Sequence, residues 1–248
     1  MALTINTNIA SLNAQRRLSQ STGDLRQSFE KLSSGLRIVR ARDDAAGLAI
    51  ADALRADQRI AGVAIRNAND GISMISISDG ALNEIGNVLT RMAELAEQSA
   101  NGTLGVSQRS ALQQEFVSLG SEIQRIASTT SFNGIQLLSG GSTVQLQVGF
   151  DSAATAQISF TGVQGTLEAL GLASSGSAAL TYSLQASSDS QGAALSSLDA
   201  VKAAISSLTT TRGSLGSVES RLTVAVNNLQ VARENFASAE SQIRDVDV

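Results

Sequence analysis

The stretch that decides the fold lies near the C-terminus, where residues 215–246 read LGSVESRLTVAVNNLQVARENFASAESQIRDV. Its apolar residues recur at alternating spacings of three and four: Leu215, Val218, Leu222, Ala225, Leu229, Ala232, Phe236, Ala239, Ile243 and Val246. This repeat places all of them on one side of a helix, as in a coiled-coil seam. Leu195, Leu198, Val201, Ile205 and Leu208 extend the seam upstream, and Ser188 with Gln191 has the spacing of a capping box. The pattern predicts one helix over about 188–245.

Three further helices are predicted upstream. The longest begins after Asp43-Asp44 and ends at Asn101-Gly102, a pair that favours a left-handed C-cap. Its main seam comprises Ile65, Ala68, Ile72, Ile75, Leu82, Leu89 and Ala96, and apolar residues on its other sides indicate several packing neighbours. A helix over 107–129 follows, and Phe132-Asn133-Gly134 turns the chain after it. At the start of the chain, Leu18, Leu25, Phe29, Leu32 and Leu36 form another apolar stripe.

The segment 135–187 has a different character, because serine and glycine accumulate in it. Apolar residues alternate with polar ones over 144–150, which predicts a strand, and Ile158 with Phe160 supplies a hairpin partner across 151–155. Residues 166–171 fit one helical turn, and 172–187 fits a flexible connection. The predicted fold is mainly α: a rod of long coiled-coil-like helices with a small β-hairpin at one end.

The amino-acid composition excludes most kinds of metal site and catalytic site. The 248 residues contain no Cys, His, Trp or Pro, only 3% are aromatic, and the net charge is −4. Without Cys or His there is no ordinary zinc or haem site and no Ser-His or Cys-His nucleophile, so we expect no catalytic residue, metal or cofactor. No basic excess indicates nucleic-acid binding, and no long apolar run indicates a membrane span. The residues favour a structural or interaction protein.

Several motifs then resemble a known family. They are Ile5-Asn-Thr-Asn8, Leu32-Ser-Ser-Gly-Leu-Arg-Ile38, Asp43-Asp-Ala-Ala-Gly-Leu-Ala49, Arg66-Asn-Ala-Asn-Asp-Gly-Ile-Ser73, Gly80-Ala-Leu-Asn-Glu-Ile85, Gln98-Ser-Ala-Asn101, Ser131-Phe-Asn-Gly134 and Ser241-Gln-Ile-Arg-Asp245. In order and spacing they resemble bacterial flagellin, over 1–138 and 190–248. The chain resembles a short flagellin whose variable outer domains are reduced to the segment around 140–187.

The resemblance implies a subunit that self-assembles with other flagellin subunits into the extracellular filament of the bacterial flagellum. It implies four regions: an inner-core helix with its connecting segment (1–43), outer-rod helices (44–138), the hairpin and flexible insertion (139–187) and the return helix (188–248). Seam packing is assigned to Ile72, Ile75, Leu82, Leu89, Leu222, Leu229 and Phe236. Further implied partners are the flagellar type III export apparatus, an export chaperone and the cap protein, which together imply a secreted protein.

Two departures from the family pattern qualify these expectations. The connecting segment Val39-Arg-Ala-Arg42 is more basic than is usual, and flagellins continue past Val248 with a further terminal helix. The second departure predicts that residues 1–40 lack an internal partner and are disordered in the free monomer, and that the chain does not polymerise until that helix is restored.

The resemblance also implies recognition by the vertebrate innate receptor for flagellin, through Arg91, Leu95 and Glu115. Thr90, Ala93 and Glu97 depart from the usual pattern of that patch, which predicts weakened recognition. The main alternative function is a hook–filament junction protein of the flagellum, which shares the terminal helices. A flagellin with a protease in its outer domain would need a zinc-binding histidine helix, and the chain has no histidine.

Overall fold

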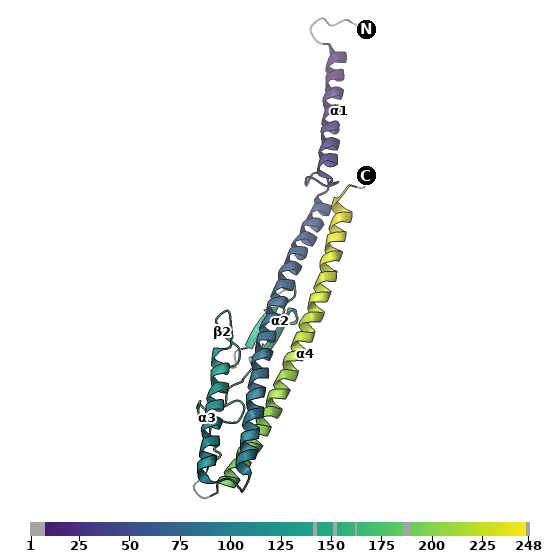
Figure 1. Cartoon of the computed structure of the whole chain (residues 1–248). Coiled ribbons are helices and arrows are strands. Elements are labelled where there is room, and N and C mark those ends of the chain that lie inside the picture. The colour runs from purple at the N-terminus through teal and green to yellow at the C-terminus, as the bar shows by residue number, and fades with distance from the viewer. Residues whose placement is uncertain (1–7, 141–142, 151–152, 162, 186–188, 247–248) are drawn as a thin grey trace. The chain divides into compact units, whose positions relative to one another are not determined.

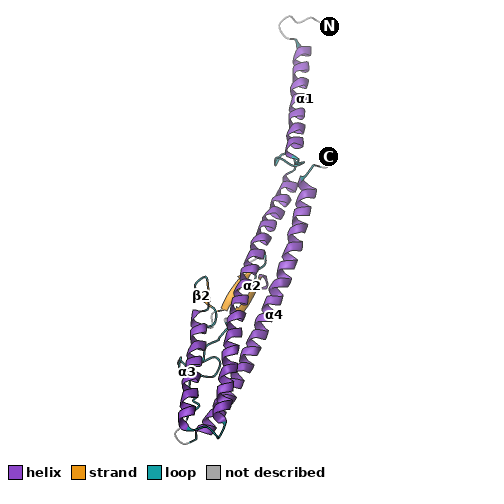
Figure 2. Ribbon diagram, viewed as in Figure 1, coloured by secondary structure: helices purple, strands orange, loops and turns teal. Residues whose placement is uncertain are grey.

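Four long helices dominate the computed structural model, which describes residues 8–140, 143–150, 153–161, 163–185 and 189–246 (Figures 1 and 2). They are α1 (Ile9–Ser34), α2 (Ala45–Ala100), α3 (Val106–Thr129) and α4 (Ser190–Arg244). The mainly α fold predicted from the sequence is confirmed, with helix bounds close to the expected ones. The chain forms two units, one of Met1–Val63 with Leu229–Val248 and one of Ala64–Asn228, which we describe separately.

Side-chain caps begin three of the helices, and in α1 the Asn8 side chain accepts the backbone N–H of Ser11 at 3.1 Å. The Asp44 carboxylate accepts the backbone N–H of Gly47 at 2.9 Å at the start of α2. The Asp189 carboxylate accepts the N–H of Gly192 at 2.8 Å at the start of α4. Such caps satisfy N–H groups that have no partner within the helix. Asp189 therefore caps α4, whereas the capping box was expected from Ser188, which lies outside the described residues.

The end of α2 differs from the expected left-handed cap. Neither Asn101 nor Gly102 has a positive φ. The Asn101 carbonyl instead accepts the N–H of Leu104 at 3.3 Å and the Arg109 guanidinium at 3.0 Å. A buried arginine from the next helix thus satisfies this carbonyl, so the predicted left-handed C-cap is wrong.

In the unit of Ala64–Asn228, α2 and α4 run antiparallel and share a core. Asp79 pairs with Arg212, and a Cβ added at Gly86 would lie 3.2 Å from Leu208. The core takes fully buried large side chains from α2 and α3, from residues 137–138 between the two hairpins and from residues 167–172 after the second hairpin; they include Ile75, Leu82, Ile85, Leu89, Met92, Leu95, Phe116, Ile123, Leu137, Leu138, Leu167 and Leu172. Apolar burial of this extent is the main stabilising contribution to such a unit.

The predicted seams lie in this core, with one exception. Ile75, Leu82, Leu89 and Leu222 are fully buried, and Ile72 packs against them while partly exposed. Leu195, expected at the start of the α4 seam, is 48% exposed; Ala194, Ser197 and Leu198 are buried in that turn instead. The helix has 3.6 residues per turn, so a strict spacing of three and four drifts around it.

The chain turns through a two-residue hairpin after α3. Strands β1 (Ser131–Phe132) and β2 (Ile135–Gln136) pair antiparallel. The two residues between them, Asn133 and Gly134, have φ of 48° and 79°. Positive φ at both central positions is typical of a type I′ turn, for which Asn-Gly is the favoured pair. The turn predicted at Phe132-Asn133-Gly134 is confirmed.

The second hairpin also matches its prediction in register. Strand β3 (Thr143–Gln147) pairs antiparallel with β4 (Gln157–Thr161), with Val144 opposite Phe160 and Leu146 opposite Ile158. A short 3-10 helix, η1 (Ala154–Ala156), precedes β4. The strand ends earlier than expected, and Phe150 is 43% exposed. Asp151, in the predicted turn, lies outside the described residues.

The segment after the second hairpin is packed, where a flexible connection was expected over 172–187. One turn is closed by the Leu170 N–H donating to the Thr166 carbonyl at 3.0 Å, as predicted for 166–171. Beyond it, Leu172 and Leu184 are fully buried. The Gln113 side chain of α3 accepts the Leu184 N–H at 2.6 Å. The interpretation as a flexible connection is therefore wrong for the described part, because two leucines of a Ser- and Gly-rich stretch enter the core.

In the other unit, α1 stands apart from the buried residues. None of its residues is buried, whereas Ile38 in the following loop and Ala51 and Ala61 of α2 are. In the terminal part of α4, Leu229 is 5% exposed and Phe236 is partly buried, on the side that the seam predicts. The core of this unit therefore lies on the loop, α2 and α4.

Candidate assembly surfaces

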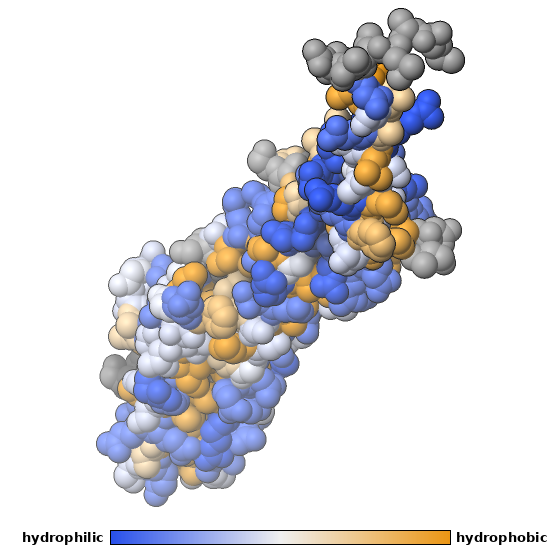
Figure 3. Space-filling view, turned by 90° about the horizontal axis from the view of Figure 1, so that it is seen from above, coloured by the Kyte–Doolittle hydropathy of each residue, from blue (hydrophilic) through white to orange (hydrophobic). Residues whose placement is uncertain are grey.

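Among the described residues, α1 carries a row of exposed apolar side chains. Leu18, Leu25, Phe29 and Leu32, here called the α1 stripe, are 54% to 69% exposed. The space-filling view shows apolar residues (orange) at the surface beside the grey N-terminal residues, where α1 lies (Figure 3). Contiguous exposed apolar surface of this kind marks a protein interaction site.

The geometry of the α1 stripe indicates what kind of surface would cover it. Its members are spaced by three, four or seven residues, so they lie on one side of the helix. Charged residues such as Arg17, Asp24 and Lys31 fall outside this stripe. One apolar stripe on an otherwise polar helix is the pattern that packs against another helix.

A second surface joins α2 and α3 through Arg91 and Glu115, two of the three residues expected to contact the innate receptor. Arg91 Nη2 lies 2.8 Å from Glu115 Oε1, and Arg91 Nη1 lies 3.0 Å from Glu94 Oε2. The hydrogen bonds that Arg91 donates to Glu94 and then to Glu115 raise the pKa of Arg91 above its ordinary value. Both Arg91 and Glu115 are about half exposed and so accessible to a partner.

Leu95, the third expected contact, is fully buried in the core of its unit. It lies one position from the α2 seam, but α3 covers that side of α2, so the side chain is enclosed. The expectation that Leu95 contacts a receptor is therefore corrected: its role in this structure is packing.

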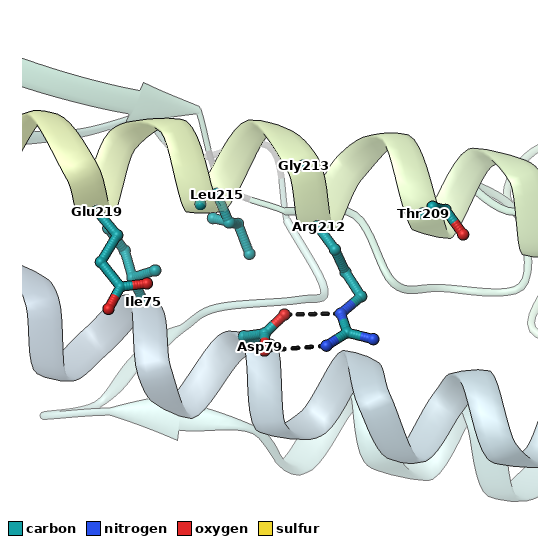
Figure 4. A pocket seen from close by; sticks show the side chains of 8 residues that line it. Ile75, Asp79, Thr209, Arg212, Gly213, Leu215 and Glu219 are labelled. Carbon is teal, nitrogen blue, oxygen red and sulfur yellow. Dashed lines mark hydrogen bonds and ion pairs between the residues drawn. The ribbon is translucent and has the colours of Figure 1, made fainter.

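A groove between α2 and α4 was not predicted from the sequence (Figure 4). Its volume is about 440 Å³, and its lining consists of Ile75, Asp79, Thr209, Arg212, Gly213, Leu215, Gly216 and Glu219. Arg212 binds Asp79 through two bonds of 2.7 Å and 3.1 Å, which raises the pKa of Arg212. The pair joins residues 133 positions apart, so no local sequence pattern signals it. The groove presents an ion pair over an apolar floor and no catalytic arrangement.

Metal binding and membrane spanning were also considered for the described residues. Among them, no group of three or more His, Cys, Asp or Glu side chains is placed to hold a metal ion. No helix in the described ranges is long and apolar enough to cross a membrane. The surfaces that remain to be explained are those for other proteins.

Comparison with known proteins places the chain in a family. A family model described as the bacterial flagellin N-terminal helical region matches residues 5–143, which is more than half of the chain. The chain belongs to the bacterial flagellin family. The model of the bacterial flagellin C-terminal helical region matches residues 198–248, so the two matched regions contain all of α1 to α3 and most of α4.

Curated flagellins share about half of their residues with this chain where they align. Polar flagellin F of Vibrio parahaemolyticus is 49% identical over 159 residues, which cover 64% of this chain and 42% of that protein. Flagellin A of Vibrio cholerae is 48% identical over 165 residues, which cover 66% of this chain and 44% of that protein. The aligned part of the chain thus spans less than half the length of these relatives.

Solved structures agree with the fold. A crystal structure of Bacillus cereus flagellin is similar with a TM-score of 0.55 and 28% identity, covering 66% of this chain and 88% of that one. A putative flagellar hook-associated protein from Vibrio parahaemolyticus is similar with a TM-score of 0.67 over 82% of this chain, but at 14% identity. At that identity the likeness shows the fold alone.

Proposed function

We propose that the chain is a structural, non-catalytic subunit of the bacterial flagellar filament, used for swimming. The observation that carries this proposal is the α1 stripe, because a helix with no buried residue and one apolar side needs a partner helix. In a filament of identical subunits, other copies of the chain supply that surface.

The same proposal extends to how the chain reaches the filament. It is secreted through the flagellar export channel, helped by an export chaperone, and placed under the cap protein at the filament tip. A chain with no cysteine needs no disulfide to be made after export. The helices rely on packing rather than on a metal or cofactor, which suits a subunit that folds at its destination.

The hook–filament junction protein is the second candidate. Identity of 48% to 49% with flagellins, against 14% with a hook-associated protein, favours the filament subunit. The two kinds of protein differ in the assembly that they form, because a filament subunit adds repeatedly to a growing filament whereas a junction protein forms a short assembly.

Electron microscopy of seeded growth tests the proposal. The purified protein is added to sheared flagellar filament fragments from a Vibrio relative, and the seeds are measured before and after incubation. A filament subunit lengthens the seeds in proportion to the protein consumed. Seeds that acquire only a short terminal structure would favour the junction protein, and seeds that bind none of the chain would overturn both.

We also propose that the exposed Arg91 and Glu115 contact the vertebrate innate receptor for flagellin. Both side chains lie on one surface and are held together at 2.8 Å. Arg91→Ala and Glu115→Ala should each lower the signal in receptor-reporter cells and leave thermal unfolding within about 0.5 kcal/mol of the parent, as exposed substitutions do. Equal signalling by the parent and both variants would contradict this use of the surface.

A further inference from the structure

The apolar seams of α2 and α4 repeat every seven residues, so they do not specify a single register between the two helices. In the unit Ala64–Asn228, the buried residues of this repeat are Ile75, Leu82, Leu89 and Ala96 on α2, and Ala194, Val201, Leu208, Leu215 and Leu222 on α4. A slide of either helix by seven residues would again place apolar side chains opposite apolar ones. In coiled coils, polar residues at a few positions resolve this ambiguity.

One group of polar contacts lies where α2, α3 and α4 meet the chain that precedes α4. The Gln113 side chain of α3 accepts the Leu184 N–H at 2.6 Å, and the Ser99 hydroxyl of α2 donates to the Leu184 carbonyl at 3.3 Å. The Ser197 hydroxyl of α4 lies 3.0 Å from the Ser183 carbonyl and 2.9 Å from a carbonyl of its own helix, so the two carbonyls share its proton. Side chains of three helices thus bind the backbone of the same two residues.

These contacts lie in the interior of the unit. Ser99, Leu184 and Ser197 are each 0% exposed. A buried polar group that loses its partner destabilises the fold, because water cannot replace the lost bond. A slide that separated Ser99 or Ser197 from residues 183–184 would therefore be opposed by the buried groups left without a partner.

The chain before residue 183 is held along one side of α3. The Gln124 side chain accepts the Leu167 N–H at 3.3 Å. At Gly120 the missing side chain lets Leu180 approach, because a Cβ at that position would overlap Leu180. Gln113, Gly120 and Gln124 are spaced by seven and four residues, so they share one side of the helix. The segment is therefore fixed to α3 before the chain enters α4.

A second polar contact crosses between α2 and α4 in the same unit (Figure 4). Arg212 binds the Asp79 carboxylate at 2.7 and 3.1 Å and the Asn83 side chain at 3.2 Å. A slide of α4 by seven residues would bring Arg212 next to Ile72 or Gly86, which have no side chain that accepts a hydrogen bond. The Arg212 and Asp79 side chains are 38% and 43% exposed, and exposed ion pairs contribute little to stability. The pair favours the observed register only weakly.

We propose that the backbone of Ser183–Leu184, here called the pin, fixes the register of α4 against α2 and α3, with Asp79–Arg212 as a second and weaker contact. The apolar seams stabilise the packing of the helices without choosing between registers. A slide of seven residues in one direction would bring Ala204, which has no hydroxyl, to the place of Ser197. The register is a property of the single chain, so the pin goes beyond the proposed function and does not depend on filament assembly.

Hydrogen exchange in the monomer measures how firmly the pin is held. Ser99→Ala and Ser197→Ala each remove one side-chain bond to the pin, and each should make the amides of 183–185 exchange about tenfold faster or more, as expected for loss of a buried hydrogen bond. The matched control is Ser78→Ala, because Ser78 is also buried in α2 and its hydroxyl donates to a carbonyl of its own helix at 2.9 Å. Equal exchange of these amides in Ser99→Ala and Ser78→Ala would overturn the proposal.

Spin labels on α2 and α4 measure the register itself. The chain has no cysteine, so Asn87→Cys and Thr223→Cys, both at exposed positions, place one label on each helix. The parent and the control variant should each give one narrow distance. Ser99→Ala/Ser197→Ala should add a second distance displaced by up to about 10 Å, the rise of seven helical residues, and Arg212→Gln in that background should increase its population. A single unchanged distance in the triple variant would overturn the pin.

Two further outcomes are separated by the same measurements. Where the triple variant loses its helical circular dichroism, the single variant decides: a second distance in Ser99→Ala that is absent from Ser78→Ala supports the pin, and one distance common to both contradicts it. Seed elongation is scored on the parent alone. A parent with one narrow distance that does not lengthen filament seeds contradicts the proposed function and leaves the pin standing.

Discussion

Leu146 of β3 lies directly over Gly71 of α2, in space that a Cβ at position 71 would occupy. Leu222 of α4 lies on the same spot, 3.3 Å from the position of that Cβ. Nearby, the Asn67 side chain of α2 donates to the Gln147 carbonyl at 3.1 Å. The second hairpin is therefore seated on α2 at a single glycine, where α2, α4 and β3 meet.

Gly71→Ala should destabilise the chain despite the better helix propensity of alanine. The added methyl overlaps Leu146, and overpacking of a closed site costs about 1–3 kcal/mol. Gly80→Ala is the matched control: Gly80 is also within α2, has nothing within 4 Å of its Cβ position, and should gain up to about 1 kcal/mol. Thermal melts followed by circular dichroism should shift in opposite directions, and a stabilised Gly71→Ala would show that the hairpin is not seated there.

The α4 seam predicts that substitutions at two positions close in sequence will have different effects on the free energy of unfolding. Leu222 is fully buried, so Leu222→Ala should cost about 2–5 kcal/mol of unfolding free energy. Val224 is 55% exposed two residues later, and Val224→Ala should stay within about 0.5 kcal/mol of the parent. Urea unfolding measures both, and similar losses in the two variants would contradict the assigned seam.

Asp43 should make the loop between α1 and α2 sensitive to acid. Hydrogen bonds from the backbone N–H groups of Arg40 and Val39 lower the pKa of Asp43 below its ordinary value of 3.8. A lowered folded-state pKa means that the carboxylate stabilises the fold above pH 3.8, and that this contribution is lost as the pH falls through the folded-state pKa. The amide shifts of Val39 and Arg40, followed by NMR, should titrate together with a midpoint below 3.8 and should not titrate this way in Asp43→Asn. A midpoint at or above 3.8 would contradict the contact.

Periodicity predicts most of the fold because long helices repeat one packing rule over many turns. The α4 seam could thus be followed from Leu215 to Phe236 without a structure. The phase error at Leu195 comes from the drift of a strict three-and-four spacing around the helix, whereas the burial of Leu95 depends on what covers a second side of α2. Periodicity along one helix does not contain that information.

The polar contacts could not be predicted from the sequence for a related reason, which is that they join residues on different elements. Arg37 caps carbonyls 205 and 206 residues away, and Arg212 meets Asp79 on another helix. The cluster of Arg37, Arg40 and Arg42 was visible as charge, but only the fold shows that the first two bind opposite helices. Leu172 and Leu184 were missed because isolated leucines in a Ser- and Gly-rich stretch carry no periodic signal.

The α1 stripe is the surface through which we propose that copies of the chain assemble, and seeded sedimentation of Leu25→Asp against Gln20→Asp tests this proposal most directly. Leu25 is 54% exposed, so the substitution should leave the thermal melt unchanged, and Gln20 is an exposed residue on the polar side of the same helix. Filament seeds offer partner surfaces that a dilute monomer does not have, so in place of the earlier expectation that the chain does not polymerise, we predict that the parent and Gln20→Asp pellet with filament seeds and elongate them, while Leu25→Asp stays in the supernatant. Pelleting and elongation by Leu25→Asp at the level of the parent would contradict assembly through the α1 stripe.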